Sequence, residues 1–536
     1  MVTEITEDSL FGVLGGALGV EPDQPDYRMH VLKKACEALL LQNDTDDADD
    51  DIYDAIMRSE DDMDDDSVGY EPVEMLVPSK PPVNTSMLAD DCHDGTAAVE
   101  WLIHPKQVDS FMENNEMKPL FISRVKYRSM YSGLFDSGGI VEALKRKRLR
   151  YGLDIDVTRV DDGVRKNFNY NKHEEYAEKH DVADAKVALR RFTHDKCSLR
   201  VLHPQRFTEP LWHLMYMLES YWGSCVGCNV YWTPKHSQGF APHFDDIDAY
   251  ILQIQGTKRW RLFNSVDTQT VLPRYSSRDF HKSELGAPVF DQVIEPGDLL
   301  YLPRGCIHEA ECLDEDSLHL TISTNQRNSI FEFCNVLLPS EIEIQAMSNI
   351  RIRRTLPPGF VHHANSLAGD STQGINIQTE ISDIIQQITR QADIASGVDR
   401  WFMNFMLHRL PPPTQAKIPP ESCSNSKLKK KSSVGLTYYD SAYPILDSRE
   451  EQDTLFICHC LSNPREQHQT GEGREDEECS VPPQLELPVS CLETAVSLLN
   501  QEPINLSDVP ETHDYSITKL QVAQALVDAG ILTVYS

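Results

Sequence analysis

Seven short apolar runs constrain the fold of this chain more than any other feature of its sequence. They are rich in Val, Ile, Leu and Tyr and are separated by turns that contain Gly or Pro, a pattern typical of β-strands. The runs are Leu153–Arg159, Ser198–Leu202, Asn229–Thr233, Ala249–Ile254, Arg259–Phe263, Asp298–Leu302 and Ser317–Ser323. Short strands at this spacing predict an all-β sandwich or barrel over the middle of the chain.

The composition changes on the N-terminal side of this β region. Residues 44–66 hold 13 acidic residues and one arginine. A segment so acidic and so poor in apolar residues is expected to be disordered, because it cannot bury enough apolar surface to fold. We therefore assign residues 1–94 to an acidic tail and linker, and we place the start of the folded region near Gly95.

The C-terminal side of the chain has a helical pattern. Helices are predicted over Glu341–Arg354 and Ile375–Ala395, and the proline run at 411–413 marks a further boundary. The other elements predicted here are polar, solvated loops at 414–433 and 463–480, a helix at Ser516–Ala529 and a strand at Ile531–Tyr535.

The charge balance narrows the choice of partner. The chain carries 84 Asp and Glu against 50 Lys and Arg, a formal net charge of −34. Such a surface repels phosphate backbones and attracts basic proteins, so direct nucleic-acid binding is disfavoured. The sequence has no apolar run long enough to predict a membrane helix. Its first residues are acidic, whereas a secretory signal starts with basic residues. Its 13 cysteines indicate a reducing compartment.

One pair of motifs carries the chemistry. His243 and Asp245 are two residues apart, so on an extended segment their side chains point to the same face. His308 follows an apolar run and the turn Pro303-Arg-Gly305. Two histidines and one carboxylate are the facial triad of non-heme Fe(II) oxygenases, which leaves positions for a cosubstrate and O2. Zinc usually takes a tetrahedral set rich in Cys and His, so we favour iron. The alternative is a surface His-x-Asp motif and an unrelated core histidine.

Lys258 lies in the hairpin that follows the predicted strand Ala249–Ile254. A lysine at a hairpin is normally solvated. If the strands close into a barrel, however, Lys258 lies beside the strand with the His-x-Asp motif, and an inward ammonium group needs an anion. A dicarboxylate cosubstrate would supply that anion through a charge-assisted hydrogen bond.

The sequence resembles the JmjC ribosomal oxygenases, and among them the nucleolar type described as bifunctional lysine-specific demethylase and histidyl-hydroxylase. The resemblance covers residues 97–336 strongly and 337–536 more loosely. The segments that carry it are EWLIHP (100–105), YSGLF (131–135), RYGLDIDVTRV (150–160), CSLRVLHPQ (197–205), GCNVYWTP (227–234), SQGFAPHFDDIDAYILQIQGTKRW (237–260), LGAPVFDQVIEPGDLLYLPRGCIHEAEC (285–312) and SLHLTISTNQRN (317–328).

The resemblance implies a mainly β fold and a role for each site residue. It implies a double-stranded β-helix, the cupin-like JmjC barrel, over residues 95–336 with a core at 197–336. It also implies a helical dimerisation region at 337–410 and a winged-helix-like domain at 411–536. The implied site residues are the metal ligands and catalytic residues His243, Asp245 and His308, the cofactor-binding residues Lys258 and Asn229, and the substrate-binding residues Arg200, Tyr231 and Ser323.

The resemblance implies a dioxygenase that uses Fe(II), 2-oxoglutarate and O2 to hydroxylate a histidine of a large-subunit ribosomal protein. It also implies a homodimer and a location in the nucleus, within the nucleolus, supported by the basic runs at 145–148 and 427–431. The acidic N-terminal tail departs from the family, whose nucleolar members carry a basic one. Two alternatives stay open: a histone H3 lysine demethylase with the same cofactors, and a non-catalytic cupin-like interaction scaffold.

Overall fold

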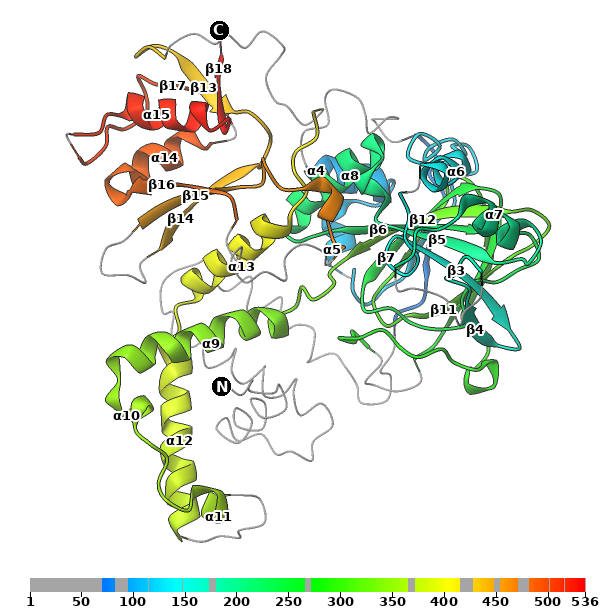
Figure 1. Ribbon diagram of the computed structural model, residues 1–536, viewed down its shortest axis with the longest axis horizontal. Helices are drawn as coiled ribbons and strands as arrows, with labels where there is room; N and C mark the ends of the chain where they lie inside the picture. The colour runs from blue at the N-terminus through cyan, green and yellow to red at the C-terminus, as the bar shows by residue number, and fades with distance from the viewer. Residues whose placement is uncertain are drawn as a thin grey trace. The chain divides into compact units, whose positions relative to one another are not determined.

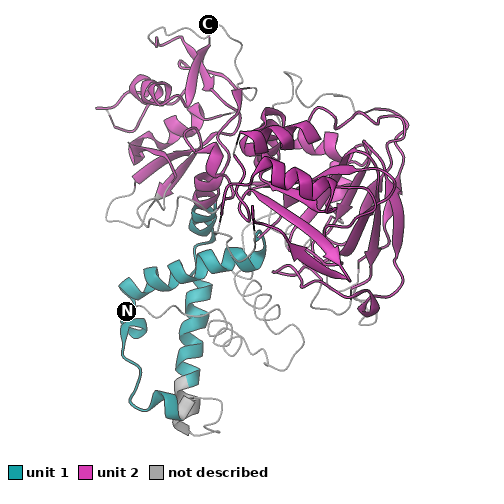
Figure 2. Cartoon of the chain, turned by 45° about the vertical axis from the view of Figure 1, so that its right-hand side comes forward, with its two compact units in different colours: residues 1–67, 327–401 teal, residues 68–326, 402–536 magenta. Residues whose placement is uncertain are grey.

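The computed structural model divides the chain into two compact units (Figure 2). The larger unit spans residues 68–326 and 402–536, and the described part of the smaller unit spans 327–401. The structure describes residues 70–81, 95–113, 115–146, 148–172, 180–265, 271–364, 372–414, 428–447, 454–470, 482–500, 502–514 and 516–535. The acidic segment 44–66 lies outside these residues.

A nine-stranded sheet forms the centre of the larger unit. Strand β12 lies at the middle of this sheet and pairs antiparallel with both β6 and β7. The strand order is β1 (Glu74–Leu76), β2 (Leu120–Ile122), β10 (Leu299–Leu302), β7 (Asp248–Gln255), β12 (Ser317–Thr324), β6 (Gly227–Thr233), β5 (Ser198–Leu202), β3 (Ile155–Asp161) and β4 (Val164–Asn167).

A second, three-stranded sheet faces the first. Its strands are β11 (Ile307–Cys312), β8 (Lys258–Phe263) and β9 (Phe290–Ile294), paired antiparallel in that order. Ile251 and Leu300 from the large sheet pack with Trp260, Leu262 and Phe290 from the small one in a single buried cluster. Two sheets that share an interior make the β-sheet core of a cupin-like barrel, as the sequence predicts.

Helices cover the outer face of the large sheet (Figure 1). They are α4 (Gly95–Ile103), α5 (Val108–Met112), α6 (Ser137–Lys145), α7 (Ala185–Thr193) and α8 (Glu209–Trp222). Helix α4 packs on α8 at Gly95, where a Cβ atom would lie 2.7 Å from the carbonyl oxygen of Met217. A glycine is therefore needed there because the two backbones approach too closely for any side chain.

The structure adds elements that the sequence pattern does not indicate. Each of the seven predicted strands is present, with ends shifted by a few residues, but β9, β11 and α8 were missed. Strand β1 lies within the segment that we assigned to tail and linker, and it pairs with β2 through Glu74 and Leu120. Three residues between flanking prolines are too few to show a strand period.

The C-terminal part of the larger unit has its own core. One sheet has the order β17 (Ile504–Asn505), β13 (Ser433–Leu436) and β18 (Leu532–Tyr535), and another has β14 (Ala442–Asp447), β15 (Thr454–His459) and β16 (Gln484–Pro488). Helices α14 (Leu492–Leu498) and α15 (Lys519–Asp528) pack between them. A capping box in which Thr518 and Gln521 exchange hydrogen bonds starts α15.

The smaller unit is helical, as predicted. It contains α9 (Ile330–Ser348), α10 (Ile350–Arg353), α11 (Phe360–Ala364), α12 (Thr372–Arg390) and the first half of α13 (Ile394–His408). Gln345 of α9 donates to the carbonyl of Ile388 on α12 (3.2 Å), and Arg400 of α13 pairs with the buried Glu341 (3.3 Å). Within the described residues, every helix is too short or too polar to cross a bilayer.

Candidate active site

Main-chain hydrogen bonds hold the two predicted histidine ligands side by side. The amide of His243 donates to the carbonyl of His308 (3.1 Å), and the amide of His308 donates to the carbonyl of His243 (2.9 Å). The amide of Gly305 donates to the carbonyl of Asp245 (2.8 Å). The segment before β7 is thereby attached to the start of β11, although about 60 residues separate them in sequence.

Each imidazole is oriented by a backbone carbonyl two residues earlier. Nδ1 of His243 lies 2.8 Å from the oxygen of Ala241, and Nδ1 of His308 lies 2.9 Å from the oxygen of Cys306. A carbonyl only accepts, so Nδ1 carries the proton in both rings and the Nε2 lone pair is left free. This is the tautomer that a metal-binding histidine requires.

The three predicted ligands converge. One donor atom from each of His243, Asp245 and His308 lies within 4.8 Å of the others. The Nε2 atoms of His243 and His308 lie 3.7 and 3.8 Å from the two carboxylate oxygens of Asp245. Burial, and then the neighbouring His243, lowers the pKa of His308 to about 4, so this imidazole is neutral at pH 7 and suited to bind a cation.

Lys258 points into the same interior. It starts β8, and its side chain is 5% exposed. Among the described residues, its ammonium makes one hydrogen bond, to Oγ1 of Thr233 (3.2 Å), and burial lowers its pKa. A buried ammonium with one hydroxyl partner has unmet capacity for an anion. Asn229 lies on β6, two residues from Tyr231, and its Oδ1 atom is buried without a hydrogen-bond partner among the described residues.

The predicted substrate residues share the inward face of the large sheet. Arg200 of β5 stands opposite Tyr231 of β6, and Ser323 of β12 stands opposite Gly227. The guanidinium of Arg200 donates to the carboxylate of Asp156 (3.0 Å). We call the half-exposed side chains of Arg200, Asn229, Tyr231, Ser323, His243 and Asp245 the site opening.

Three aromatic side chains near the ligands were not predicted. His319 stacks on Tyr231 with ring centroids 4.8 Å apart, and Trp260 lies 5.4 Å from His319 and 5.8 Å from His308. Phe240 lies 6.0 Å from His243. Strand alternation could have found two of them, because Trp260 is two residues from Lys258 and His319 four from Ser323. Phe240 lies in a loop, which gives no such signal.

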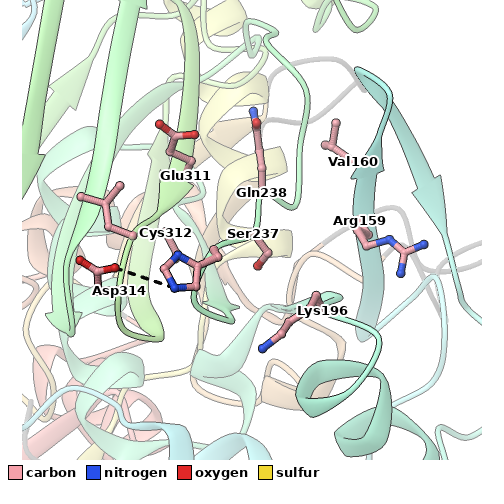
Figure 3. A pocket seen from close by; sticks show the side chains of 10 residues that line it. Arg159, Val160, Lys196, Ser237, Gln238, Glu311, Cys312 and Asp314 are labelled. Atoms are coloured by element: carbon pink, nitrogen blue, oxygen red, sulfur yellow. Dashed lines mark ion pairs between the residues drawn. The ribbon is translucent and has the colours of Figure 1, made fainter.

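A separate cavity of about 550 Å³ opens beyond the end of β11 (Figure 3). Its lining includes Arg159, Lys196, Gln238 and Glu311, but none of the three predicted metal ligands. Cys312 also lines it and pairs in register with Lys258 across β11 and β8. This cavity therefore lies next to the lysine end of the barrel rather than at the histidines.

The barrel and its site belong to a known class. Residues 200–330 match the family described as JmjC domain, so the chain carries a JmjC domain. That match contains the three predicted metal ligands, Lys258 and all residues of the site opening.

The relatives agree with the resemblance to ribosomal oxygenases. The chain is 36% identical over 318 residues to "Ribosomal oxygenase 1" of Danio rerio, covering 58% of this chain and 56% of the relative. It is 34% identical over 325 residues to "Bifunctional lysine-specific demethylase and histidyl-hydroxylase NO66" of Aedes aegypti, covering 59% and 49%. The chain thus spans about half the length of the curated relatives it matches. The ribosomal oxygenase YcfD of Escherichia coli is a structural neighbour, with TM-score 0.41, 15% identity and coverage of 80% of this chain and 98% of that one.

Proposed function

We propose that this protein is an Fe(II)- and 2-oxoglutarate-dependent dioxygenase that hydroxylates a histidine of a large-subunit ribosomal protein. The observation that carries the proposal is the convergence of His243, Asp245 and His308 in one barrel with the buried ammonium of Lys258. The names of the relatives, ribosomal oxygenase and histidyl-hydroxylase, support the reaction and the substrate. The formal net charge of −34 favours capture of a basic protein.

The residues of the site fit the cofactors that this activity needs. His243, Asp245 and His308 would hold Fe(II), since their free Nε2 and carboxylate atoms are ligands of a facial triad. Lys258 and Asn229 would hold 2-oxoglutarate. When bound, Fe(II), 2-oxoglutarate and O2 supply the oxidising power to hydroxylate an unactivated carbon.

The protein's own part is positioning and exclusion of water. The carbonyls of Ala241 and Cys306 fix the two imidazole rings by holding the Nδ1 protons. Arg200, Tyr231 and Ser323 would orient the substrate side chain at the site opening. Trp260, 4% exposed, forms an apolar wall between the lysine and the histidines, which keeps water from the reacting carbon.

The proposal is tested by incubating the full chain with Fe(II), 2-oxoglutarate and a panel of histidine-containing peptides from large-subunit ribosomal proteins. We expect succinate release and the gain of one oxygen atom on a histidine, measured by mass spectrometry. His308→Ala should abolish both, whereas His236→Ala, an exposed histidine outside the triad, should keep both. Absence of both products with wild-type protein would reject the proposal.

A second activity, demethylation of histone H3 lysine, uses the same cofactors and appears in the name of one relative. A methylated ammonium substrate would meet the guanidinium of Arg200 at the site opening, next to Tyr231. A guanidinium repels a second cation placed beside it, so we favour the neutral imidazole as substrate. Formaldehyde release from methylated H3 peptides, measured beside histidine oxidation, separates the two activities.

We further propose that residues 337–410 mediate a homodimer and that 411–536 form a winged-helix-like domain. Large apolar side chains on the smaller unit support the dimer, because a monomer rarely exposes so many in one segment. They are Ile330, Ile342, Ile344, Met347, Ile350, Leu356, Val361 and Val398.

A nuclear and nucleolar location is likewise a proposal, supported by the basic runs at 145–148 and 427–431. Direct binding of nucleic acid is not expected, because residues 414–536 carry about twice as many acidic as basic residues.

A further inference from the structure

A segment of the C-terminal part packs on the barrel instead of extending into solvent. We call residues 463–470 the junction loop; it contains the short helix η6 (Arg465–Gln467). The sequence predicts a solvated loop over 463–480, but Asn463 and His468 are 7% and 4% exposed. The side-chain amide of Asn463 donates to the carbonyls of Met406 and Arg409, both at 2.8 Å. The prediction of a solvated loop is therefore wrong at Asn463 and His468.

A buried hydrogen-bond chain attaches the junction loop to the barrel. Nε2 of His468 lies 2.7 Å from a carboxylate oxygen of Glu219 on α8, and its Nδ1 lies 2.9 Å from Nε2 of Gln205 in η2 (Pro204–Arg206). Glu219, fully buried, also accepts from the amides of Val226 (3.2 Å) and Leu410 (2.9 Å). Both ring nitrogens and both carboxylate oxygens are thus engaged in hydrogen bonds, so the cluster is a structural attachment.

A second set of contacts holds the loop from its exposed side. Arg465 donates to the carbonyl of Gln205 (2.9 Å) and pairs with Glu209 (2.7 Å). Its guanidinium also lies 4.0 Å from the ring centroid of Trp212, a favourable cation–π distance. Buried and exposed contacts together leave the loop little freedom of position.

Gln469 follows His468 in the junction loop and lies at the site opening. Its Oε1 atom is 2.8 Å from the point that a Cβ atom would occupy at Gly227, and the Cβ of Ser323 is 3.5 Å from the same point. Gln469 adopts a φ of 59°, a left-handed conformation that non-glycine residues adopt at a cost. Within the described residues its carboxamide makes no hydrogen bond, and its side chain is half-exposed. A polar group is therefore held beside Ser323 with its hydrogen-bonding capacity unused.

We propose that the junction loop completes the site opening and that Gln469 is a specificity-determining residue. Its carboxamide offers both a donor and an acceptor, the same pair that a peptide group offers. Gln469 therefore binds the main chain of the polypeptide substrate next to the residue that enters the barrel. This inference rests on the proposed function, since it names how the same site recognises its protein substrate.

The first test is Gln469→Ala in the full chain, with a histidine peptide that the wild-type protein hydroxylates. Loss of one or two hydrogen bonds made in both ground and transition states should raise KM for the peptide about five- to tenfold. The values of kcat and of KM for 2-oxoglutarate should not change. The matched control is Gln467→Ala, which removes the same side chain from an exposed position of the same loop and should leave all three constants unchanged.

A second variant tests where the junction loop lies while leaving the amino-acid sequence of the loop unchanged. Gly227 does not have a positive φ, so Gly227→Ala is compatible with strand β6, but its methyl group must displace the Gln469 carboxamide. It should raise the peptide KM in the wild-type background and add little in the Gln469→Ala background. Equal increases in both backgrounds would place the effect in Gly227 alone and overturn the role of the loop.

The outcomes separate the two proposals. If wild-type protein turns over no peptide and releases no succinate, the proposed function fails and this inference fails with it. If wild-type protein is active but Gln469→Ala has an unchanged peptide KM, the proposed function stands and the inference is overturned.

Discussion

Among the predicted site residues, Lys258 gives the clearest indication of a bound anion. Its ammonium is buried in the barrel, and its one hydrogen bond within the described residues goes to a neutral hydroxyl. Transfer of an ammonium from water to such a site is costly unless an anion accompanies it. A carboxylate of a cosubstrate would complete the site.

Lys258→Ala should therefore remove 2-oxoglutarate binding while keeping the fold. Loss of a buried charge-assisted hydrogen bond costs about 2–3 kcal/mol, so we expect the dissociation constant for 2-oxoglutarate to rise roughly 30- to 150-fold. Calorimetric titration with Mn²⁺ in place of iron measures it without turnover. Lys235→Ala, which removes an exposed lysine, is the control. An unchanged constant in the Lys258 variant would show that the lysine does not bind the cosubstrate.

His203, which directly follows β5, should make the stability of the folded protein depend on pH. Burial, and then the nearby Arg206 and His468, lowers the pKa of His203 to about 3. The folded state thus favours the neutral ring. Its contribution to stability is complete above the unfolded pKa of about 6.5 and is lost as the pH falls below it.

His203→Asn removes the titration and retains a residue that tolerates the observed φ of 53°. Between pH 7.5 and pH 5, the wild-type protein should lose about 2 kcal/mol relative to the variant. Thermal unfolding followed by calorimetry at the two pH values measures this difference. A difference that does not change with pH would mean that His203 does not titrate as an isolated buried group.

The site residues differ in how far the sequence could predict them. His243, Asp245 and Lys258 could be placed because their motifs adjoin strands, where spacing fixes direction. The carbonyls of Ala241 and Cys306 could not be predicted as partners of Nδ1, because loop conformation decides which group they face. Gln469 could not be predicted for a different reason. It contacts Gly227 only because the junction loop packs on strand β6, which is far from it in sequence.

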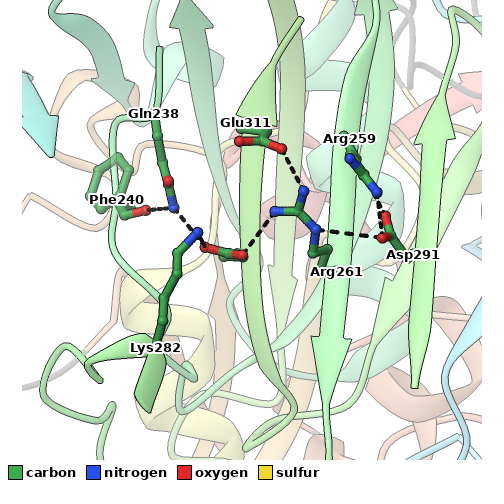
Figure 4. Close-up of polar contacts among 8 residues, drawn as sticks. Gln238, Phe240, Arg259, Arg261, Lys282, Asp291 and Glu311 are labelled. Atoms are coloured by element: carbon green, nitrogen blue, oxygen red, sulfur yellow. Dashed lines mark hydrogen bonds and ion pairs between the residues drawn. The ribbon is translucent and has the colours of Figure 1, made fainter. Parts of the chain in front are cut away.

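At the scale of elements, a row of ion pairs crosses the outer face of the small sheet (Figure 4). Arg261 of β8 donates to Glu309 (2.9 Å) and Glu311 (2.6 Å) of β11, while Arg259 donates to Asp291 of β9 (2.6 Å). Alternation along β8 places these arginines outward and Lys258 inward. The row joins the strand that carries His308 to the strand that carries Lys258.

Arg261→Met should destabilise the protein far more than Arg259→Met. Glu309 is 3% exposed, so removal of Arg261 leaves a buried carboxylate with weaker partners, at a cost of about 2–4 kcal/mol. Arg259 and Asp291 are about one-third exposed, and a pair of this kind contributes at most about 1 kcal/mol. Denaturant unfolding of both variants measures the difference. An equal decrease in the free energy of unfolding for both variants would mean that burial of Glu309 does not determine how much these ion pairs stabilise the protein.

The same row explains why β11 was missed in the sequence. The outward positions Glu309 and Glu311 are acidic, and glutamate is depleted in strands. These residues are favoured here by the arginines of β8, which no local pattern reveals. Helix α8 was missed because it is buried on several sides, including at Leu214, Tyr216 and Met217, which hides the helical period.

At the scale of the whole molecule, the smaller unit allows a direct test of assembly. Met347 and Ile350 are 73% and 69% exposed, and placing charges there should prevent an apolar interface from forming. The double variant Met347→Asp, Ile350→Asp should halve the molar mass measured by light scattering.

The control for assembly is Val164→Asp on β4 of the larger unit. Val164 is 58% exposed, so the substitution adds the same charge at a comparable apolar site. It should leave the molar mass unchanged. A wild-type protein that already has the mass of one chain would contradict the homodimer.

The central claim is that the JmjC barrel oxidises a histidine in the large ribosomal subunit. It is tested most directly by mass spectrometry of large-subunit ribosomal proteins from cells that contain the wild-type protein, the Asp245→Ala variant or neither. We predict one histidine that carries an added oxygen atom with the wild-type protein and is unmodified in the other two samples. The claim would be contradicted if all three samples had the same pattern of histidine oxidation.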